Sequence, residues 1–307
     1  MDDLTILHDA WGAPEPPSHR ARTRARSRLA SRADRPGRDR RRQVVAAGAA
    51  VVAIAAGVTV AQNLGSGRVD VPVAAGQVLE RAAKTAEQQP FTAPRDDQWV
   101  YSQDRITWQD GRTETQDRWR RADGGGEAFI DEHGKLQVQM IPRPPDRAGK
   151  PAPPLLDNYK TLASLPTDPA ALMRWAYAQD ISNGNSPKDA VVYLLFAGML
   201  RNGLVPPDLQ AAMFRAIKQI PGVTLGTTID VLGRPAYALG QTDDWLHQEL
   251  LLDKQTYAYL GQRSTVVRDA TIDPMKAGNA TGKVTKGSTV VDARVTTAVV
   301  DKPGERR

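Results

Sequence analysis

The pattern of hydrophobic and polar positions divides the chain into a short N-terminal part, one long apolar tract and a large C-terminal part. The tract covers residues 44–61, which are almost wholly apolar, and no residue between 43 and 67 is charged. A helix of that length spans roughly 27 Å, close to the hydrocarbon thickness of a bilayer. A buried core helix this long normally shows a polar stripe, and the tract has none. The sequence therefore predicts a transmembrane helix at 43–63, followed by a linker at 64–73.

The C-terminal part, residues 74–307, alternates between the two periodicities of regular secondary structure. Apolar positions at helical spacing predict a helix at 74–89 and three later helices, which begin near Asp168, Ser186 and Pro206. Two-residue alternation broken by Gly and Asp turns predicts strands on both sides of these three helices. This order predicts an α+β domain with a curved antiparallel sheet that is packed by helices. The predicted strand segments are 97–108, 113–122, 128–140, 223–232, 235–240, 245–253, 256–267 and 288–301.

Positive charge is concentrated on one flank of the apolar tract. Residues 20–42 include 11 arginines and no lysine, whereas the first 42 residues hold six acidic side chains. The positive-inside rule places the segment 1–42 in the cytoplasm and the domain at 74–307 outside the cell. From residue 68 onward, 30 basic residues face 29 acidic ones. The basic pI therefore reflects the N-terminal segment, and we expect no nucleic-acid partner.

A cleaved export signal is the alternative interpretation of the tract, because Arg41 and Arg42 resemble a twin-arginine signal. The region before the tract is too long for such a signal, and "TVAQ" is a poor cleavage site. We therefore expect an uncleaved single-pass anchor in the cell membrane, with the lipid bilayer as its first partner.

The cytoplasmic segment contains the candidate partner-binding residues. Leu4, Leu7 and Trp11 share one face of a predicted helix, and Arg24 and Arg28 belong to a basic repeat beyond a "PEPP" break. One interpretation is a basic helix in solvent or against lipid head groups. The other is a docking element in which the three apolar residues are anchors and the two arginines contact an acidic protein. The segment is too short for a typical folded domain, so we expect it to be partly disordered or helical until a partner completes its fold.

Residues with catalytic or metal-binding chemistry are sparse. The chain has no cysteine, which excludes disulfides and thiolate sites. "GNATGKV" at 278–284 lacks one residue of the phosphate-loop spacing and the final Ser or Thr, so we expect a flexible loop there. His133 and His247 have no neighbours at metal-ligand spacing and are expected to be solvated or hydrogen-bonded. We expect neither an enzyme nor a cofactor.

Several segments form a pattern in their order and spacing: "PRDDQWVY", "LASLPTDPAAL", "PPDLQAAMFRAIKQIPGV", "ELLLDKQTYAYLGQRS" and "TTAVVDKPGERR". Together with the acidic amphipathic start, the arginine-rich stretch and the apolar tract, they resemble a largely uncharacterised family of actinobacterial single-pass membrane proteins. The genes of that family often lie beside those of extracytoplasmic-function sigma factors. The resemblance covers nearly the entire chain; it implies a cell-envelope protein, suggests a role with a sigma factor, and supplies no catalytic residues. More loosely, the exterior domain resembles the half-barrel lipoprotein-sensing and lipid-carrying modules of bacterial envelopes.

Three hypotheses of function follow. The first is a bitopic cell-envelope protein whose exterior sensory or interaction domain regulates a sigma factor, or another cytosolic regulator, through the segment 1–42. The alternative is a membrane-tethered carrier or binder of a lipid-like ligand, which would use an apolar groove between the curved sheet and the helices. Side chains such as Trp99 and Met213 would fill that groove if it bound nothing. The third is a structural envelope protein without a ligand.

Overall fold

The computed structural model describes one compact unit of the chain, and the described residues are 73–141, 156–179, 186–272 and 282–306. The predicted transmembrane helix at 43–63 and the segment 1–42 lie outside these ranges. None of the helices within them is long and apolar enough to cross a bilayer.

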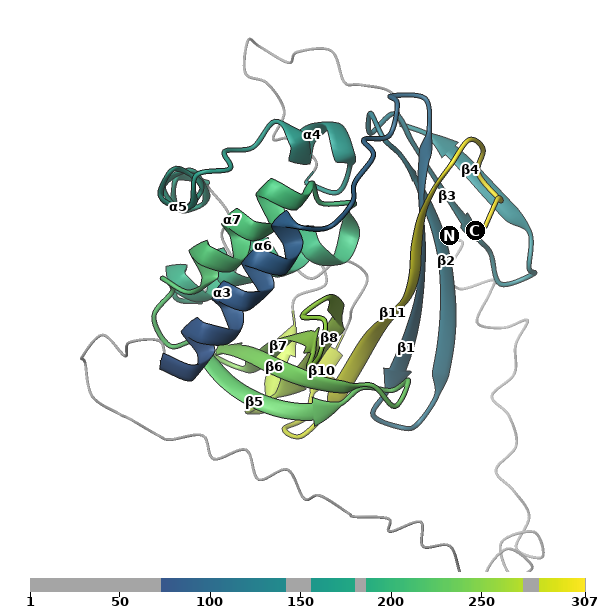
Figure 1. The fold of residues 1–307 in the computed structure, drawn as a ribbon. Helices are drawn as coiled ribbons and strands as arrows, with labels where there is room; N and C mark the ends of the chain where they lie inside the picture. The colour runs from purple at the N-terminus through teal and green to yellow at the C-terminus, as the bar shows by residue number, and fades with distance from the viewer. Residues whose placement is uncertain (1–72, 142–155, 180–185, 273–281, 307) are drawn as a thin grey trace, which may run out of the picture. The chain divides into compact units, whose positions relative to one another are not determined.

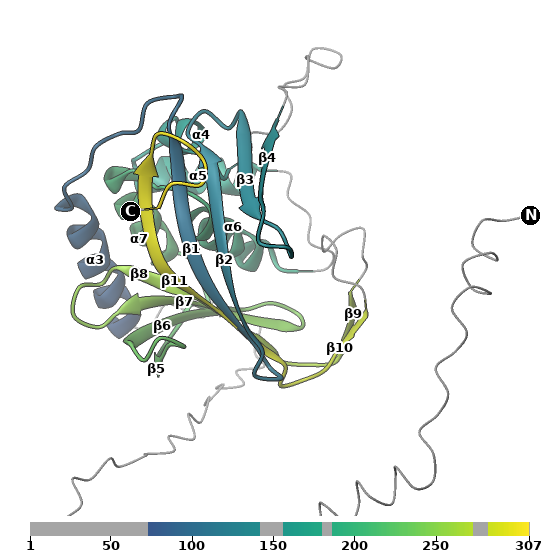
Figure 2. The same ribbon diagram turned by 90° about the vertical axis from the view of Figure 1, so that its right-hand side faces the viewer.

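A nine-stranded antiparallel sheet is the frame of this unit, with the strand order β4-β3-β2-β1-β11-β8-β7-β6-β5 (Figures 1 and 2). The strands before and after the helices therefore join into one sheet, because β1 pairs with β11. The α+β class with a curved, helix-packed antiparallel sheet is confirmed. The strands are β1 (Trp99–Trp108), β2 (Thr113–Arg121), β3 (Gly126–Ile130), β4 (Leu136–Met140), β5 (Thr224–Ile229), β6 (Pro235–Thr242), β7 (Leu246–Asp253), β8 (Tyr259–Val266) and β11 (Thr289–Val300).

A separate two-stranded ladder joins β9 (Ala270–Ile272) and β10 (Gly282–Val284). The last three residues of the expected flexible loop thus form a short strand. The backbone hydrogen bonds to β9 account for this difference, since pairing partners are not visible in a single segment.

The helices lie on one face of the sheet; in Figure 1, α3, α6 and α7 gather over its β5–β8 half, whereas the backbone of α4 bonds to Ala122 just beyond β2. The sequence predicts four of these helices to within a few residues at their ends. The short helix α4 was not predicted, because five residues are too few for a helical period to be visible. The helices are α3 (Val73–Glu87), α4 (Tyr159–Ala163), α5 (Pro169–Ala178), α6 (Lys188–Asn202) and α7 (Pro207–Ile217).

The start of α5 is set by its own sequence. Asp168 is the N-cap, and its carboxylate accepts a hydrogen bond from the backbone N–H of Ala171 at 2.8 Å. Pro169 occupies the first helical position, where the missing N–H is not needed. The N-terminus of α5 is therefore specified locally.

Replacing Asp168 with alanine is expected to lower the free energy of unfolding by about 1 kcal/mol, because one N–H at the start of the helix loses its acceptor. Urea denaturation of the full chain measures the change. Thr167→Ala is the control, since this neighbouring side chain is exposed and a surface substitution of this kind changes stability by less than about 0.5 kcal/mol. Equal losses in the two variants would contradict the capping role.

The largest hydrophobic core lies between α3, α6, α7 and the β5–β8 half of the sheet. Helix α7 contributes its apolar stripe, in which Leu209, Met213 and Ile217 are buried. Leu239 of β6 and Leu250 of β7 face this stripe from the sheet. This burial fixes the helical layer over one half of the sheet.

A second cluster lies on the opposite face of the sheet, on β1, β2 and β3. Trp99, Tyr101 and Trp119 are buried there, and the rings of Tyr101 and Trp119 stack with centroids 5.0 Å apart. The indole N–H of Trp119 donates to the carbonyl of Glu305 at 2.7 Å, so the C-terminal residues cover this face. Trp108, at the end of β1, is 37% exposed and does not belong to this cluster.

Candidate functional site

The helix-facing side of the sheet has two chemically different halves. Over β5–β8 it is apolar, and the space beneath the helices is filled by side chains, among them the fully buried Met213. Trp99 lies on the other face of the sheet, as its cluster with Trp119 shows. The apolar groove expected between sheet and helices is therefore occupied by the protein itself.

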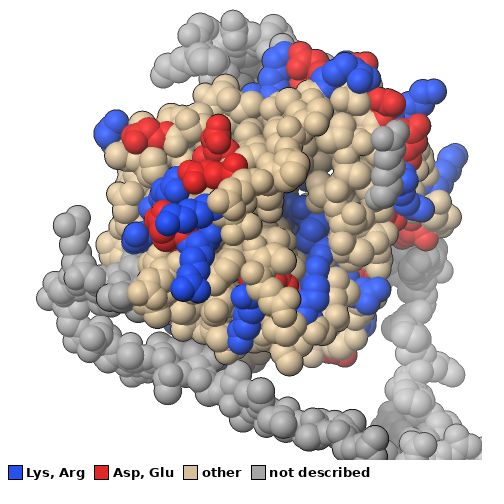
Figure 3. All heavy atoms as spheres, in the orientation of Figure 1, with Lys and Arg blue, Asp and Glu red and all other residues tan. Residues whose placement is uncertain are grey.

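The second half, on β2, β1 and β11, carries arginines. Figure 3 shows basic side chains inside a hollow between the helical layer and these strands. Arg118 and Arg120 come from β2, Arg294 from β11 and Arg201 from the last turn of α6. Arg118 and Arg120 flank the buried Trp119, so strand alternation turns both toward the helices. We call these four residues the arginine cluster.

The C-terminus of α6 anchors the cluster. Arg294 donates from Nη2 to the carbonyl of Arg201 at 2.5 Å, and Arg120 donates from Nη1 to the carbonyl of Asn202 at 2.8 Å. The last carbonyls of a helix have no partner within the helix and carry partial negative charge. Guanidinium groups satisfy both needs, which explains why the helix end lies against this part of the sheet.

Three aspartates pair with three of the arginines. Arg294 Nε lies 2.6 Å from Asp104 Oδ1, and both side chains are about nine-tenths buried. Arg201 Nε lies 2.6 Å from Asp292 Oδ2. In the third pair, Arg120 Nε lies 3.4 Å from Asp157 Oδ2.

Arg118 differs from the other members of the cluster. It donates a hydrogen bond to the side chain of Gln116 and forms no ion pair with any carboxylate in the described ranges. Arg120 is also incompletely satisfied, because its buried Nε has no hydrogen-bond acceptor among the described residues. An anion that entered the hollow would meet the Arg118 guanidinium, which has no carboxylate partner among the described residues, and the Nε of Arg120, which lies 3.4 Å from Asp157 Oδ2 without a hydrogen bond to it.

The pKa shifts of Arg120 and Asp104 also indicate that the charges of the arginine cluster are not fully balanced. Burial lowers the pKa of Arg120, against the effect of Asp157, and the charges of Arg118 and Arg201 lower it further. Burial also raises the pKa of Asp104, although Arg294 opposes this shift. Negative charge near Arg118 and Arg120 would relieve the repulsion between like charges.

Apolar side chains border the cluster on the same side of the sheet. Val100 is directly opposite Arg120 in the β1–β2 ladder, and side chains directly opposite each other lie on one face. Ile106 and Trp108 follow on that face of β1, the former buried and the latter 37% exposed. On this face of the sheet, guanidinium groups are thus followed by apolar and aromatic side chains, a pairing that suits a molecule with an acidic and an apolar end.

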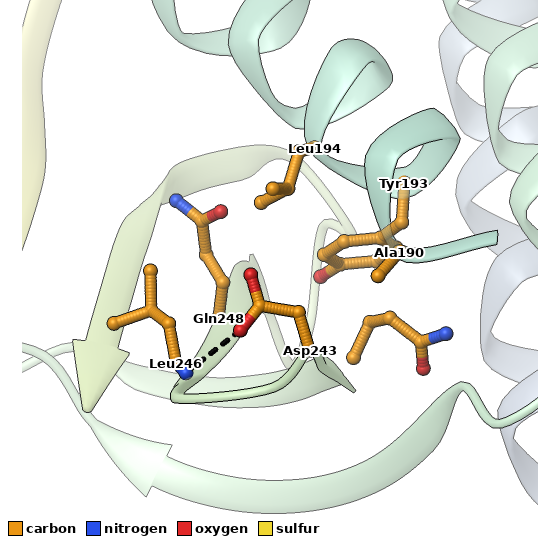
Figure 4. A pocket seen from close by; sticks show the side chains of 7 residues that line it. Ala190, Tyr193, Leu194, Asp243, Leu246 and Gln248 are labelled. Carbon is orange, nitrogen blue, oxygen red and sulfur yellow. Dashed lines mark hydrogen bonds between the residues drawn. The ribbon is translucent and has the colours of Figure 1, made fainter. Parts of the chain in front are cut away.

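A second hollow lies beside α6 (Figure 4), and it is too narrow to hold a water molecule. Asp243 faces it, but the carboxylate already accepts the backbone N–H groups of Trp245 and Leu246 at 2.9 and 2.8 Å. Such bonds close a turn. A hollow this narrow cannot hold a ligand, so the turn between β6 and β7 explains it.

The residues predicted as a partner-binding site, Leu4, Leu7, Trp11, Arg24 and Arg28, lie outside the described residues and stay a prediction. The arginine cluster was not predicted. A signal was present in "DRWRRA", where two arginines alternate with a tryptophan on one strand, but the neutral charge balance of the C-terminal part concealed it.

The two histidines differ in their surroundings. His133 is exposed in a turn, whereas His247 is partly buried and its Nδ1 lies 2.7 Å from the hydroxyl of Thr242. The expected solvated and hydrogen-bonded states are confirmed. In the described part of the chain, His, Asp and Glu side chains form no group that could hold a metal ion.

No protein-family model matches this sequence. No curated protein matches it either. Two solved structures are similar in part: a DUF1329 family protein from Desulfovibrio piger ATCC 29098, with 13% identity, and a LolA superfamily protein from Nitrosomonas europaea, with 9% identity. Each alignment covers 75% of this chain, and 93% and 94% of the respective structures, with a TM-score of 0.21. At this TM-score the similarity carries no argument about ligand or activity.

Proposed function

We propose that the domain is a binding module for a lipid-like ligand with an acidic head group, which the arginine cluster holds. The observation that carries this proposal is Arg118: it is on the helix-facing side of β2 next to Arg120, and its guanidinium forms no ion pair with a carboxylate among the described residues. A guanidinium binds carboxylate and phosphate oxygens through two parallel N–H donors.

Arg120 supports the same conclusion from the buried side of the cluster. A donor without an acceptor in a buried position costs free energy, so its persistence in the fold needs a reason. An oxygen atom of a ligand head group between Arg118 and Arg120 would supply the acceptor for Nε of Arg120.

The apolar border favours an amphiphile over a free anion. Ile106 and Trp108 continue from the arginine cluster along β1 on the same face. Contact with an acyl or isoprenoid chain would cover the exposed part of Trp108. The predicted anchor at 43–63 fits this function, because it would hold the module beside a membrane that contains acidic lipids.

Hexyl phosphate is a suitable probe, because it has an acidic head and a short apolar chain and stays soluble. We expect it to bind the full chain in nanodiscs of zwitterionic lipid, as measured by isothermal titration calorimetry. Arg118→Gln should weaken this binding about tenfold, the loss of one hydrogen bond to a charged group. Hexanol should show no binding, and inorganic phosphate should bind more weakly than hexyl phosphate.

Arg105→Gln is the matched control. Arg105 lies on β1 but is exposed and on the opposite face from Asp104 and Ile106. Its replacement removes the same charge from the protein and should leave the affinity unchanged. Equal weakening by both variants would show binding through overall charge, and undiminished binding in Arg118→Gln would exclude the cluster as the site.

A further inference from the structure

Strand β4 is an edge of the nine-stranded sheet and pairs only with β3 among the described residues. The hydrogen bonds at the two ends of this ladder show which residues of β4 direct their backbone N–H and C=O groups toward β3. Asp131 N–H donates to the Lys135 carbonyl at 2.9 Å, and Ile141 N–H donates to the Gly125 carbonyl at 3.0 Å. Hydrogen-bonded pairs alternate with non-bonded ones in an antiparallel ladder. The backbone N–H and C=O groups that point away from β3 are therefore those of Leu136, Val138 and Met140.

Edge strands are usually protected against pairing by charged residues, proline or bulges. The sequence of β4, "LQVQM", has no charge and no proline, and its register with β3 is regular. Val138 is 47% exposed and Met140 is 57% exposed. Among the described residues, this edge is unpaired and partly apolar.

The sequence of β4 is nearly symmetric about Val138. If a second copy lies antiparallel with Val138 opposite Val138, Leu136 faces Met140 of the other copy and Gln137 faces Gln139. Apolar side chains then meet on one face of the joined sheet and amides on the other. The outward N–H and C=O groups also match, because the set at positions 136, 138 and 140 is symmetric about the same residue.

We propose that two copies of this chain associate by antiparallel pairing of their β4 strands, with a two-fold axis at Val138. Each outward N–H of one copy then donates to an outward C=O of the other, and the two nine-stranded sheets become continuous. A two-fold axis makes the contact self-complementary and closed, so it stops at the dimer. The apolar row at the junction continues the face on which Trp99 and Trp119 are buried.

Charge at the axis tests this arrangement. In the full chain purified in detergent, sedimentation should show a dimer, and Val138→Lys should weaken its association by about fivefold or more, because two like charges lie directly opposite. Val138→Glu should do the same. An equimolar mixture of the two variants should recover the dimer, since lysine then faces glutamate; misfolding of either variant cannot produce such recovery.

Ile229→Lys is the matched control, because Ile229 is 63% exposed on β5, the other edge strand of the sheet. This variant should associate as the unmodified chain does. A monomeric chain, a dimer that Val138→Lys leaves intact, or equal weakening by the two lysine variants would each overturn the proposal.

Disulfide cross-linking is a second test, because the chain contains no cysteine and an introduced one can react only with its copy in the other chain. Cα atoms of a hydrogen-bonded antiparallel pair are about 5.5 Å apart, which a disulfide can bridge. Val138→Cys should therefore yield a cross-linked dimer when its two thiols are oxidised by copper phenanthroline, whereas Ile229→Cys should remain monomeric. Cross-linking of both variants to the same extent would contradict pairing at β4.

Discussion

Replacing Arg294 with alanine is expected to lower the free energy of unfolding by about 3–5 kcal/mol, the usual result of removing one partner from a buried ion pair. Asp104, whose side chain is 8% exposed, would be left without its counter-ion. The carbonyl of Arg201 and the hydroxyl of Thr297 would lose hydrogen bonds as well. The bond to the Arg201 carbonyl joins β11 to the end of α6. Its loss should therefore lower the stability of the protein and change the shape of the hollow.

Urea denaturation of the full chain measures this loss. Arg95→Ala is the control, because Arg95 also pairs with an aspartate, Asp301, but its side chain is 64% exposed. Exposed pairs contribute less than about 1 kcal/mol. In a double variant, Asp104→Leu with Arg294→Met, neither charge of this pair remains buried and most of the stability should return. Losses of similar size in Arg294→Ala and Arg95→Ala would refute the role of burial.

The second large effect concerns Glu249 of β7, on the face of the sheet opposite the helices. Burial would raise the pKa of this carboxyl, but the neighbouring imidazole of His247, the hydrogen bonds from Arg263 and the charge of Arg263 lower the pKa to about 2. Arg263 donates to both carboxylate oxygens, and His247 Nε2 lies 3.6 Å from Oε1. The ionised form of Glu249 is therefore more stable, relative to the protonated form, in the folded protein than in the unfolded chain.

The dependence of stability on pH follows from the direction of this shift. A carboxyl whose pKa is depressed on folding stabilises the protein above its unfolded pKa, here 4.5, and this contribution disappears as the pH falls toward 2. The shift corresponds to about 3 kcal/mol at neutral pH. Glu249→Gln should lower the free energy of unfolding by about that amount at pH 7 and should flatten its fall between about pH 4.5 and 2.

Urea denaturation at a series of pH values tests both parts of this prediction. Glu132→Gln is the control, because the Glu132 side chain is 87% exposed in a turn, and it should change stability by less than about 0.5 kcal/mol. If the free energy of unfolding falls equally steeply between about pH 4.5 and 2 in the unmodified chain and in Glu249→Gln, other carboxyls determine this fall.

Much of the secondary structure could be predicted because its signals are local. Asp168 followed by Pro169 fixes the start of α5, and Gly203 follows the last residue of α6. The apolar stripe of α7 shows in the spacing of Leu209, Met213 and Ile217. Each of these features acts between residues a few positions apart, so the sequence contains the complete interaction.

The candidate site could not be predicted in the same way. Arg294 and Asp104 are 190 positions apart, and Arg294 and Arg201 are 93 apart. They meet because β11, the last strand, pairs with β1, the first. Strand alternation indicated that Arg118 and Arg120 share a face, but not that this face is the one beneath α6.

By itself, the sequence determined the order and type of the longer helices and of the strands of the nine-stranded sheet, the α+β class and the concentration of charge before the apolar tract. Those properties depend on periodicity, caps and turns, which are interactions between near neighbours. Only the tertiary structure decided which half of the sheet the helices cover, where guanidinium groups gather and which strands form the edges of the sheet. These outcomes depend on pairing between distant strands and on which apolar surfaces bury one another, and such contacts exist only in the folded chain.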